Sequence, residues 1–185
     1  MCLFYVIKKT KFVYAKTASE MKKMIFVRHG RAEEPSTMIP DFERSLTAIG
    51  KNISEKMAMQ LKEKEKIPAV IITSPAFRAY ETALVFARVL ESDPEKIVIK
   101  NNLYNRSNLN TFSEIVEEIS DDTDSVILFG HNPSLTEIPD RLSKSGCDFL
   151  PKSGIVCLSF KTDTWKGIVR EKGIIEYFIK PEKTL

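Results

Sequence analysis

Four runs of apolar residues have the length of β-strands and mostly lack the alternation of a strand with one face in water. They are Met24–Val27, Ala69–Ile72, Val126–Phe129 and Ile155–Phe160. Continuous apolar runs are typical of parallel strands that are covered on both faces. A further run, Ile174–Ile179, is expected to close the sheet at an edge.

Helical patterns lie between these runs. Thr47 is expected to cap a first helix, and Ser74-Pro75 to supply the N-cap and first position of a second. Asn132-Pro133 is expected to start a fourth helix, which Pro139 should kink or end. The apolar residues expected to face inward are Ile49, Ile53, Met57 and Leu61 in the first helix, Tyr80, Ala83, Leu84 and Ala87 in the second, and Phe112, Ile115, Val116 and Ile119 in the third.

Strands that alternate with helices predict an α/β fold, a three-layer α/β/α sandwich around a mainly parallel central sheet. The 185 residues, 43% hydrophobic and 29% charged, suit one globular domain and exclude a disordered or fibrous chain. The sequence contains no repeat and no obvious linker. No window approaches the roughly 18–20 apolar residues of a membrane helix, so no membrane partner is expected.

The formal net charge of +3 is unevenly distributed. Residues 1–23 carry six lysines and one acid, whereas the remaining 162 residues carry 22 basic and 24 acidic groups. The body therefore has no broad cationic surface for nucleic acid. Residues 1–20 are predicted to be an extension outside the core, either the product of a start upstream of Met21 or a loosely attached edge segment. Residues 21–185 are predicted to form the single domain.

Cysteine and histidine usage gives no sign of a disulfide or a metal site. Cys2, Cys147 and Cys157 form no Cys-x-x-Cys pair, so a reduced cytoplasmic location without stable disulfides is predicted. The two histidines, His29 and His131, lie far apart in the chain with no cysteine cluster beside them. We therefore expect no metal and no cofactor.

Both histidines directly follow an apolar run. His29 lies between Arg28 and Gly30 after the first run, and His131 follows Gly130 after the third. Arg78 falls on the first turn of the helix that follows the second run. Because the carboxyl ends of parallel strands meet at one edge of a sheet, two imidazoles and two guanidiniums are expected to converge there.

This set of side chains suits phosphoryl transfer. Arginine forks bind phosphoryl oxygens and stay charged, and a neutral imidazole can attack phosphorus to form a covalent phosphohistidine. A helix N-terminus beside Ser74 would add N–H donors, and the cationic side chains balance the charge without a metal. Taken singly, each residue has a simpler interpretation: a packed or surface histidine, a solvated arginine or a turn glycine. Their coincidence favours a site.

Arg28-His29-Gly30 resembles the signature of the histidine phosphatase superfamily, whose fold is phosphoglycerate mutase-like. Further segments, in the family's order and within residues 24 to about 160, resemble the SixA-type bacterial phosphohistidine phosphatases. They are Arg44-Ser45-Leu46-Thr47-x-x-Gly50, Ser74-Pro75-x-x-Arg78-Ala79-x-x-Thr82, Leu103-Tyr104 and Gly130-His131-Asn132-Pro133.

The resemblance implies roles for seven residues. His29 would be the nucleophile that carries the phosphoryl group, and the rest of the phosphate pocket would be Arg28, Arg78 and His131. Arg44 resembles a further pocket arginine that touches phosphate or substrate; a surface arginine before the helix cap is its alternative interpretation. Substrate-binding roles are also expected for Gly30 and for Asn132, which should cap the following helix and orient the His131 loop.

Many members of the family use a carboxylic acid to protonate the leaving group, often after the second arginine motif. Residues 103–106 of this chain offer no acid there. An alkoxide leaving group needs such an acid, whereas a phosphoramidate nitrogen can leave already protonated, which favours a phosphohistidine substrate. The loop after His29 holds other candidates, each more simply interpreted as a solvated acid: Glu33, Glu34, Asp41 and Glu43.

The sequence therefore predicts a metal-independent phosphatase that works through a covalent phosphohistidine and acts on phosphohistidine in proteins. Two alternatives remain open at this stage. One is a small-molecule phosphomonoesterase on the same scaffold, and the other is a non-catalytic module that binds phosphorylated proteins. A mutase is less expected, because short loops leave little to retain a phosphorylated intermediate.

Overall fold

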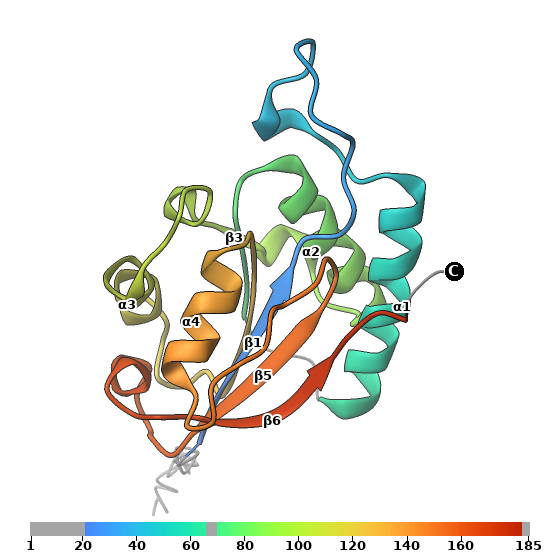
Figure 1. Cartoon of the computed structure of the whole chain (residues 1–185). Coiled ribbons are helices and arrows are strands. Elements are labelled where there is room, and N and C mark those ends of the chain that lie inside the picture. Colours follow the sequence, from blue (N-terminus) through green and yellow to red (C-terminus); the bar gives the residue numbers. More distant parts are fainter. Residues whose placement is uncertain (1–20, 66–69, 183–185) are drawn as a thin grey trace, which may run out of the picture.

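The computed structural model describes residues 21–65 and 70–182. They form one six-stranded sheet, with the strand order β3-β2-β4-β1-β5-β6, and the helices that cover it (Figure 1). The strands are β1 (Lys22–Arg28), β2 (Val70–Thr73), β3 (Val98–Ile99), β4 (Ser125–Gly130), β5 (Ile155–Phe160) and β6 (Ile174–Ile179). The α-helices are α1 (Ala48–Lys64), α2 (Phe77–Val89), α3 (Leu109–Glu117) and α4 (Ser134–Leu142).

The sheet is mainly parallel, as predicted. β4 pairs in parallel with both β1 and β2, and β3 pairs in parallel with β2. β5 is antiparallel to β1, and β6 closes the sheet as the edge strand beside β5. Grouping β5 with the parallel strands was wrong, because burial on both faces produces the same apolar run in either direction. The two-residue strand β3 was not predicted.

Two hydrophobic cores lie on opposite faces of the sheet, and alternate residues of β1 belong to each. Met24 and Phe26 pack in the core that α3 and α4 cover, whereas Ile25 and Val27 pack in the core that α1 and α2 cover. Figure 1 shows α3 and α4 on one side of the sheet and α1 and α2 on the other. The predicted three-layer α/β/α sandwich is confirmed.

Helix α1 begins as predicted, and most of its predicted inward face is confirmed. The Thr47 hydroxyl accepts a hydrogen bond from the Gly50 N–H at 3.0 Å, which confirms the cap. Met57 and Leu61 are buried as expected, and Ile53 packs against the same core. Ile49, also expected to face inward, is 51% exposed, and the small residues Gly50, Ser54 and Ala58 are buried as well. Position 50 has no room for a side chain, because a Cβ atom there would lie 2.0 Å from the carbonyl oxygen of Arg31.

Gly50→Ala is therefore expected to lower the free energy of unfolding by about 2–3 kcal/mol, because the added methyl group would clash with the backbone of Arg31, which cannot move away as a side chain could. Urea unfolding measures the difference. The matched control is Asn52→Ala on the exposed side of the same helix, where the better helix propensity of alanine should leave stability unchanged or slightly raised. Equal stability of the two variants would contradict this packing argument.

The ends of two other helices differ from expectation. Ser74 does not cap α2, which begins at Phe77 after an Ala76 N-cap without a side-chain hydrogen bond. Asn132 does not cap α4 either, because the N-cap is Pro133. Pro139 was expected to kink or end α4, but the helix continues to Leu142, and the Pro139 carbonyl accepts the Ser143 N–H at 2.9 Å.

The inward faces of the other helices were largely predicted. In α2, Ala83 and Ala87 are buried as expected, whereas Tyr80 and Leu84 are only half-buried, and Phe86 is the large residue that fills the core. In α3 the expected apolar face is confirmed, with Phe112, Ile115 and Val116 fully buried. Ile119, just beyond the end of the helix, packs against the same core.

Some predictions fall outside the described residues. The extension at residues 1–20 and Cys2 lie there, as does Ala69, the first residue of the second predicted strand. Cys147 and Cys157 are both free thiols.

Within residues 21–65 and 70–182, no helix combines the length and the apolar character that crossing a membrane requires. The same ranges hold no group of three or more histidine, cysteine, aspartate and glutamate side chains arranged to bind a metal ion.

Candidate active site

The pairing of β1 with β4 brings the two histidines together at the carboxyl ends of these strands. Arg28 lies opposite Gly130 in the parallel ladder, and the His29 N–H donates to the Gly130 carbonyl at 3.1 Å. Each histidine is thus the first residue beyond the same rung. The centroids of their rings lie 5.0 Å apart, so the convergence expected from the sequence is present.

The backbone around His29 selects one tautomer of its ring. Nδ1 of His29 lies 2.8 Å from the carbonyl oxygen of Gly30. A carbonyl oxygen only accepts hydrogen bonds, so Nδ1 must carry the proton. The lone pair is then on Nε2, which is the atom that a nucleophilic imidazole uses.

His131 is held by the loop after β2. Its Nε2 lies 2.8 Å from the hydroxyl of Ser74, and Ser74 is itself fixed by its N–H, which donates to the Phe129 carbonyl at 3.0 Å. Nδ1 of His131 is buried without a hydrogen-bond partner among the described residues. Ser74, expected to cap a helix, instead positions a histidine.

Arg28 is anchored by the segment that leads into β5. One guanidinium nitrogen donates to the Leu150 carbonyl at 3.1 Å, and the exposed ring of Phe149 lies 5.3 Å from the guanidinium carbon. The same Leu150 carbonyl accepts the side-chain amide of Asn132 at 3.1 Å. Asn132 therefore ties the His131 loop to the Arg28 anchor. The Nε atom of Arg28 is buried and unpaired within the described part of the chain.

Arg78 lies on the first turn of α2 and is buried, and Asp41 holds its fork. Two guanidinium nitrogens of Arg78 donate to Asp41, one to its carbonyl oxygen at 2.5 Å and one to its carboxylate at 2.9 Å. The carboxylate also accepts from Arg44 at 2.7 Å and from the Tyr104 hydroxyl at 3.1 Å. Arg44 and Arg78 therefore share Asp41 as their ion-pair partner.

Asp41 is more than the solvated loop acid that the sequence suggested. Burial raises the pKa of its carboxyl, but the hydrogen bonds from Arg44 and Arg78 outweigh this and lower the pKa to about 2. The carboxylate is therefore ionised at neutral pH and balances the charge of Arg78. The three other candidate acids, Glu33, Glu34 and Glu43, are exposed as expected.

Gly30 is enclosed by α1 and α2. Its N–H donates to the hydroxyl of Thr82 at 3.0 Å, and that hydroxyl donates to the Arg78 carbonyl at 2.6 Å. A Cβ atom on Gly30 would lie 2.6 Å from the Ser54 hydroxyl oxygen. Gly30 therefore contributes close packing, and its N–H is engaged within the protein. Thr82 links the backbones at Gly30 and Arg78.

The profile of the histidine phosphatase superfamily (branch 1) matches residues 24–142, which include His29, Arg78 and His131. The chain belongs to this superfamily. The predicted family and the predicted enzyme class, a phosphatase, are thereby confirmed.

Three relatives of this histidine phosphatase illustrate the match. An uncharacterised protein of Picosynechococcus sp. is 30% identical over 140 residues, which cover 74% of this chain and 84% of that protein. A candidate phosphohistidine phosphatase SixA of Nakamurella multipartitia superposes with a TM-score of 0.77 at 16% identity, covering 89% of this chain and 99% of that one. A protein histidine phosphatase SixA complexed with tungstate gives 0.73 at 20% identity, covering 86% and 97%. The structural matches share the phosphoglycerate mutase-like fold.

The pocket of this histidine phosphatase keeps both imidazoles neutral. Burial lowers the pKa of His29 to about 3, with further lowering by His131, Arg78 and Arg28. Burial also lowers the pKa of His131 to about 4, and the charge of Arg78 adds to the effect. Both values lie well below the ordinary histidine value of 6.5.

The two rings are therefore expected to remain neutral down to about pH 5. Because the chain has two histidines, ¹H–¹⁵N spectra of untagged protein labelled in histidine report each ring directly. His29 should appear as the Nδ1–H tautomer at pH 7. Titration of either ring between pH 6 and 7 would contradict this assignment. Since the folded values are depressed, the unfolded chain protonates first, and the free energy of unfolding should fall as the pH drops from about 6.5 towards 3.

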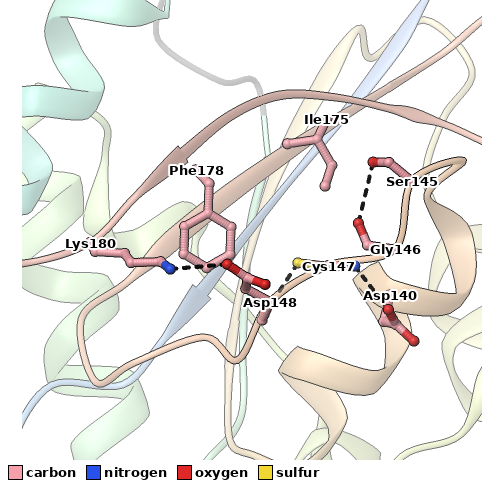
Figure 2. Close-up of a pocket in the computed structure, with 8 residues that line it drawn as sticks. All are labelled: Asp140, Ser145, Gly146, Cys147, Asp148, Ile175, Phe178 and Lys180. Carbon is pink, nitrogen blue, oxygen red and sulfur yellow. Dashed lines mark hydrogen bonds and ion pairs between the residues drawn. The ribbon is translucent and has the colours of Figure 1, made fainter.

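A second concavity, of about 640 Å³, lies between the end of α4 and β6 (Figure 2). It contains two aspartates, and its lysine pairs with one of them, Lys180 with Asp148 at 3.2 Å. An anion would meet no unpaired cation among these side chains, so this concavity is a poor candidate site for a phosphoryl group. The concavity is lined by Asp140, Ser145, Gly146, Cys147, Asp148, Ile175, Phe178 and Lys180.

Sequence reasoning gave no role to three groups that shape the pocket. Thr82 and Tyr104 belong to segments that resemble the family, but their contacts with Gly30 and Asp41 depend on the fold. The carbonyl of Leu150 holds both Arg28 and Asn132. A backbone oxygen leaves no trace in the residue type, so no sequence pattern could have identified it.

Proposed function

We propose that this histidine phosphatase hydrolyses phosphohistidine in proteins through a phosphoryl group carried on His29, without a metal ion. The observation that carries the proposal is that the Asp41 carboxylate accepts hydrogen bonds from Arg78, Arg44 and the Tyr104 hydroxyl. Burial raises the pKa of this carboxyl, but the two arginines lower it by more and favour the ionised form. An ionised carboxylate has no proton to give to a leaving alkoxide. A leaving group that departs as a neutral ring is the better match for this pocket.

In the first step, the Nε2 lone pair of His29 attacks phosphorus as the bond from phosphorus to the substrate imidazole breaks. A substrate ring protonated on its distal nitrogen leaves as neutral imidazole and needs no further proton. His29 becomes a phosphorylated imidazolium, and its Nδ1–H, which donates to the Gly30 carbonyl, stabilises the new positive charge. The exchange is nearly symmetrical, since one phosphoimidazolium replaces another.

The surrounding groups stabilise the phosphoryl oxygens during this transfer. The buried Nε–H of Arg28, which has no partner among the described residues, is available to an oxygen, and the fork of Arg78 adds charge. A phosphoryl oxygen only accepts, so His131 would donate from Nδ1 while the Ser74 hydroxyl donates to Nε2. That a SixA of the same fold is complexed with tungstate, a tetrahedral oxyanion, supports such a pocket.

In the second step, water attacks phosphorus and the P–Nε2 bond breaks. Both protons of the water remain on the phosphate, which leaves as the dihydrogen anion. His29 recovers its neutral form with the proton on Nδ1. The cycle therefore consumes one water and returns every ionisable group to its starting state.

The test compares substrates with one another on the wild-type protein. We expect kcat/KM for phosphohistidine to exceed that for a sugar phosphate by about 10³-fold or more, because the alkoxide lacks a general acid. Rapid turnover of the sugar phosphate with phosphohistidine untouched would overturn the proposal in favour of a small-molecule phosphomonoesterase. Binding of phosphohistidine protein without phosphate release would indicate a binding module instead.

A further inference from the structure

Residues 33–43, which we call the arm, extend beyond the rest of the protein next to the phosphate pocket. Figure 1 shows this segment, between β1 and α1, projecting at the end of the sheet towards which β1 points. Its base is closed by the pairing of Ala32 with Leu46 and by the hydrogen bond from the Glu33 N–H to the Ser45 carbonyl at 2.9 Å. Every residue of the arm is exposed.

The arm presents apolar side chains to solvent. Met38 is 91% exposed and Ile39 37%, and both of their N–H groups donate to the Ser36 hydroxyl, at 3.3 and 3.1 Å, which fixes the turn. Phe42, 36% exposed, continues this surface towards the pocket, because its ring lies 5.3 Å from that of Tyr104. Several large apolar side chains exposed on one short segment are a feature of protein interaction surfaces.

The arm is also acidic. It carries four carboxylates and no lysine or arginine. Asp41 is neutralised by Arg78 and Arg44, and the Glu33 carboxylate accepts the Ser45 N–H at 3.1 Å. Glu34 and Glu43 add negative charge to the exposed surface. An acidic surface with apolar residues is complementary to a partner that combines apolar and basic side chains.

Asp41 joins this surface to the phosphate pocket. It belongs to the arm, and it holds the fork of Arg78 through both its carbonyl and its carboxylate. The Tyr104 ring, which contacts Phe42, also lies 6.0 Å from the ring of His131. A molecule seated on the arm would therefore lie beside whatever occupies the pocket.

We infer that the arm is the docking surface for the protein that carries the phosphoryl group, and that it binds a region where apolar and basic side chains surround the phosphorylated residue. The inference rests on the proposed function, since it concerns a protein substrate of the same pocket. A free phosphorylated amino acid needs the pocket alone, so the arm should distinguish protein substrates from small ones.

The experiment compares two substrates and two variants. The substrates are histone H4 phosphorylated on histidine with phosphoramidate, a basic protein, and free phosphohistidine. The variant Met38→Ser/Ile39→Ser removes the apolar tip of the arm. The control is Met59→Ser, which removes a methionine that is 52% exposed on α1. Initial rates of phosphate release give kcat and KM for each pair.

We expect the tip variant to lower kcat/KM for the phosphorylated histone about 10-fold, through KM, and to change that for free phosphohistidine less than about 2-fold. The Met59→Ser variant should match the wild type on both substrates. Equal histone kinetics for wild type and tip variant would overturn the inference while leaving the proposed function intact. Failure of the wild type on both substrates would overturn the proposed function instead.

Two further measurements separate other occupants of the arm. Glu34→Gln/Glu43→Gln should raise KM for the histone and weaken its dependence on salt, as expected for a basic partner. Sedimentation should give the same mass for wild type and tip variant. A dimer that becomes a monomer in the tip variant would show that a second copy of this chain covers the arm, and would overturn the inference.

Discussion

Replacing His29 by alanine is expected to lower kcat at least about 10⁴-fold, because the proposed reaction loses the atom that receives the phosphoryl group. The phosphorylated intermediate should disappear with it. Wild-type protein mixed with ³²P-labelled phosphohistidine substrate and quenched in alkali should carry label on His29, identified by mass spectrometry of its peptides. His29→Ala should carry none.

The second histidine of the chain supplies the matched control. His131→Ala removes a ring that lies 5.0 Å from His29 and is proposed to stabilise phosphoryl oxygens. It should slow turnover by about 10²–10³-fold while still allowing label to accumulate on His29. Release of phosphate by His29→Ala at the wild-type rate, or label on His131 instead, would remove His29 from the proposed role.

Replacing Arg78 by alanine is expected to lower kcat/KM by about 10²–10⁴-fold, because the variant loses a buried guanidinium that is proposed to bind the phosphoryl oxygens. Arg78→Lys should recover only part of the rate, since an ammonium group keeps the charge but not two parallel donors. Steady-state rates with phosphohistidine measure both variants, and thermal unfolding reports how far the lost ion pair with Asp41 affects stability.

Arg88→Ala is the control on the same helix. Arg88 lies in the last turn of α2, its side chain is 68% exposed, and it pairs with Glu55 at 3.1 Å. An exposed ion pair of this kind contributes at most about 1 kcal/mol to stability, and we expect less than a 2-fold change in rate. Similar activities for the alanine variants at positions 78 and 88 would show that Arg78 does not act on the phosphoryl group.

The fold was largely predictable from the sequence because its central strands β1, β2, β4 and β5 are apolar on both faces. The apolar runs around Ile25 and Ile127 predict buried parallel strands. The residues directly after these runs lie at the edge of the sheet where the side chains converge. Strand direction was not accessible for β5, since burial alone does not distinguish parallel from antiparallel pairing. In α1 the buried positions Met57 and Leu61 were predicted correctly, whereas Gly50 was missed because a glycine carries no apolar signal.

The sequence predicted those residues of the candidate site whose chemistry depends on residue type. It did not predict the roles that depend on contacts in the folded protein. His29, His131 and Arg78 follow from their places after strands and at a helix start. The role of Asp41 could not be predicted, because the sequence does not distinguish a loop acid that contacts only water from one that accepts two hydrogen bonds from an arginine. Ser74 was assigned a helix cap from its neighbour proline, yet its hydroxyl contacts His131.

The pairing of Arg28 with Gly130 also determines at what stage of synthesis the site can form. Arg28 and His29 leave the ribosome early, but their neighbour strand and the Leu150 carbonyl that anchors Arg28 come more than a hundred residues later. Closing so long a loop must precede any local contact between the two histidines. A nascent chain that ends before residue 150 therefore lacks the carbonyl that anchors Arg28, and the proposed site is expected to be complete only once this part of the last third of the protein has emerged.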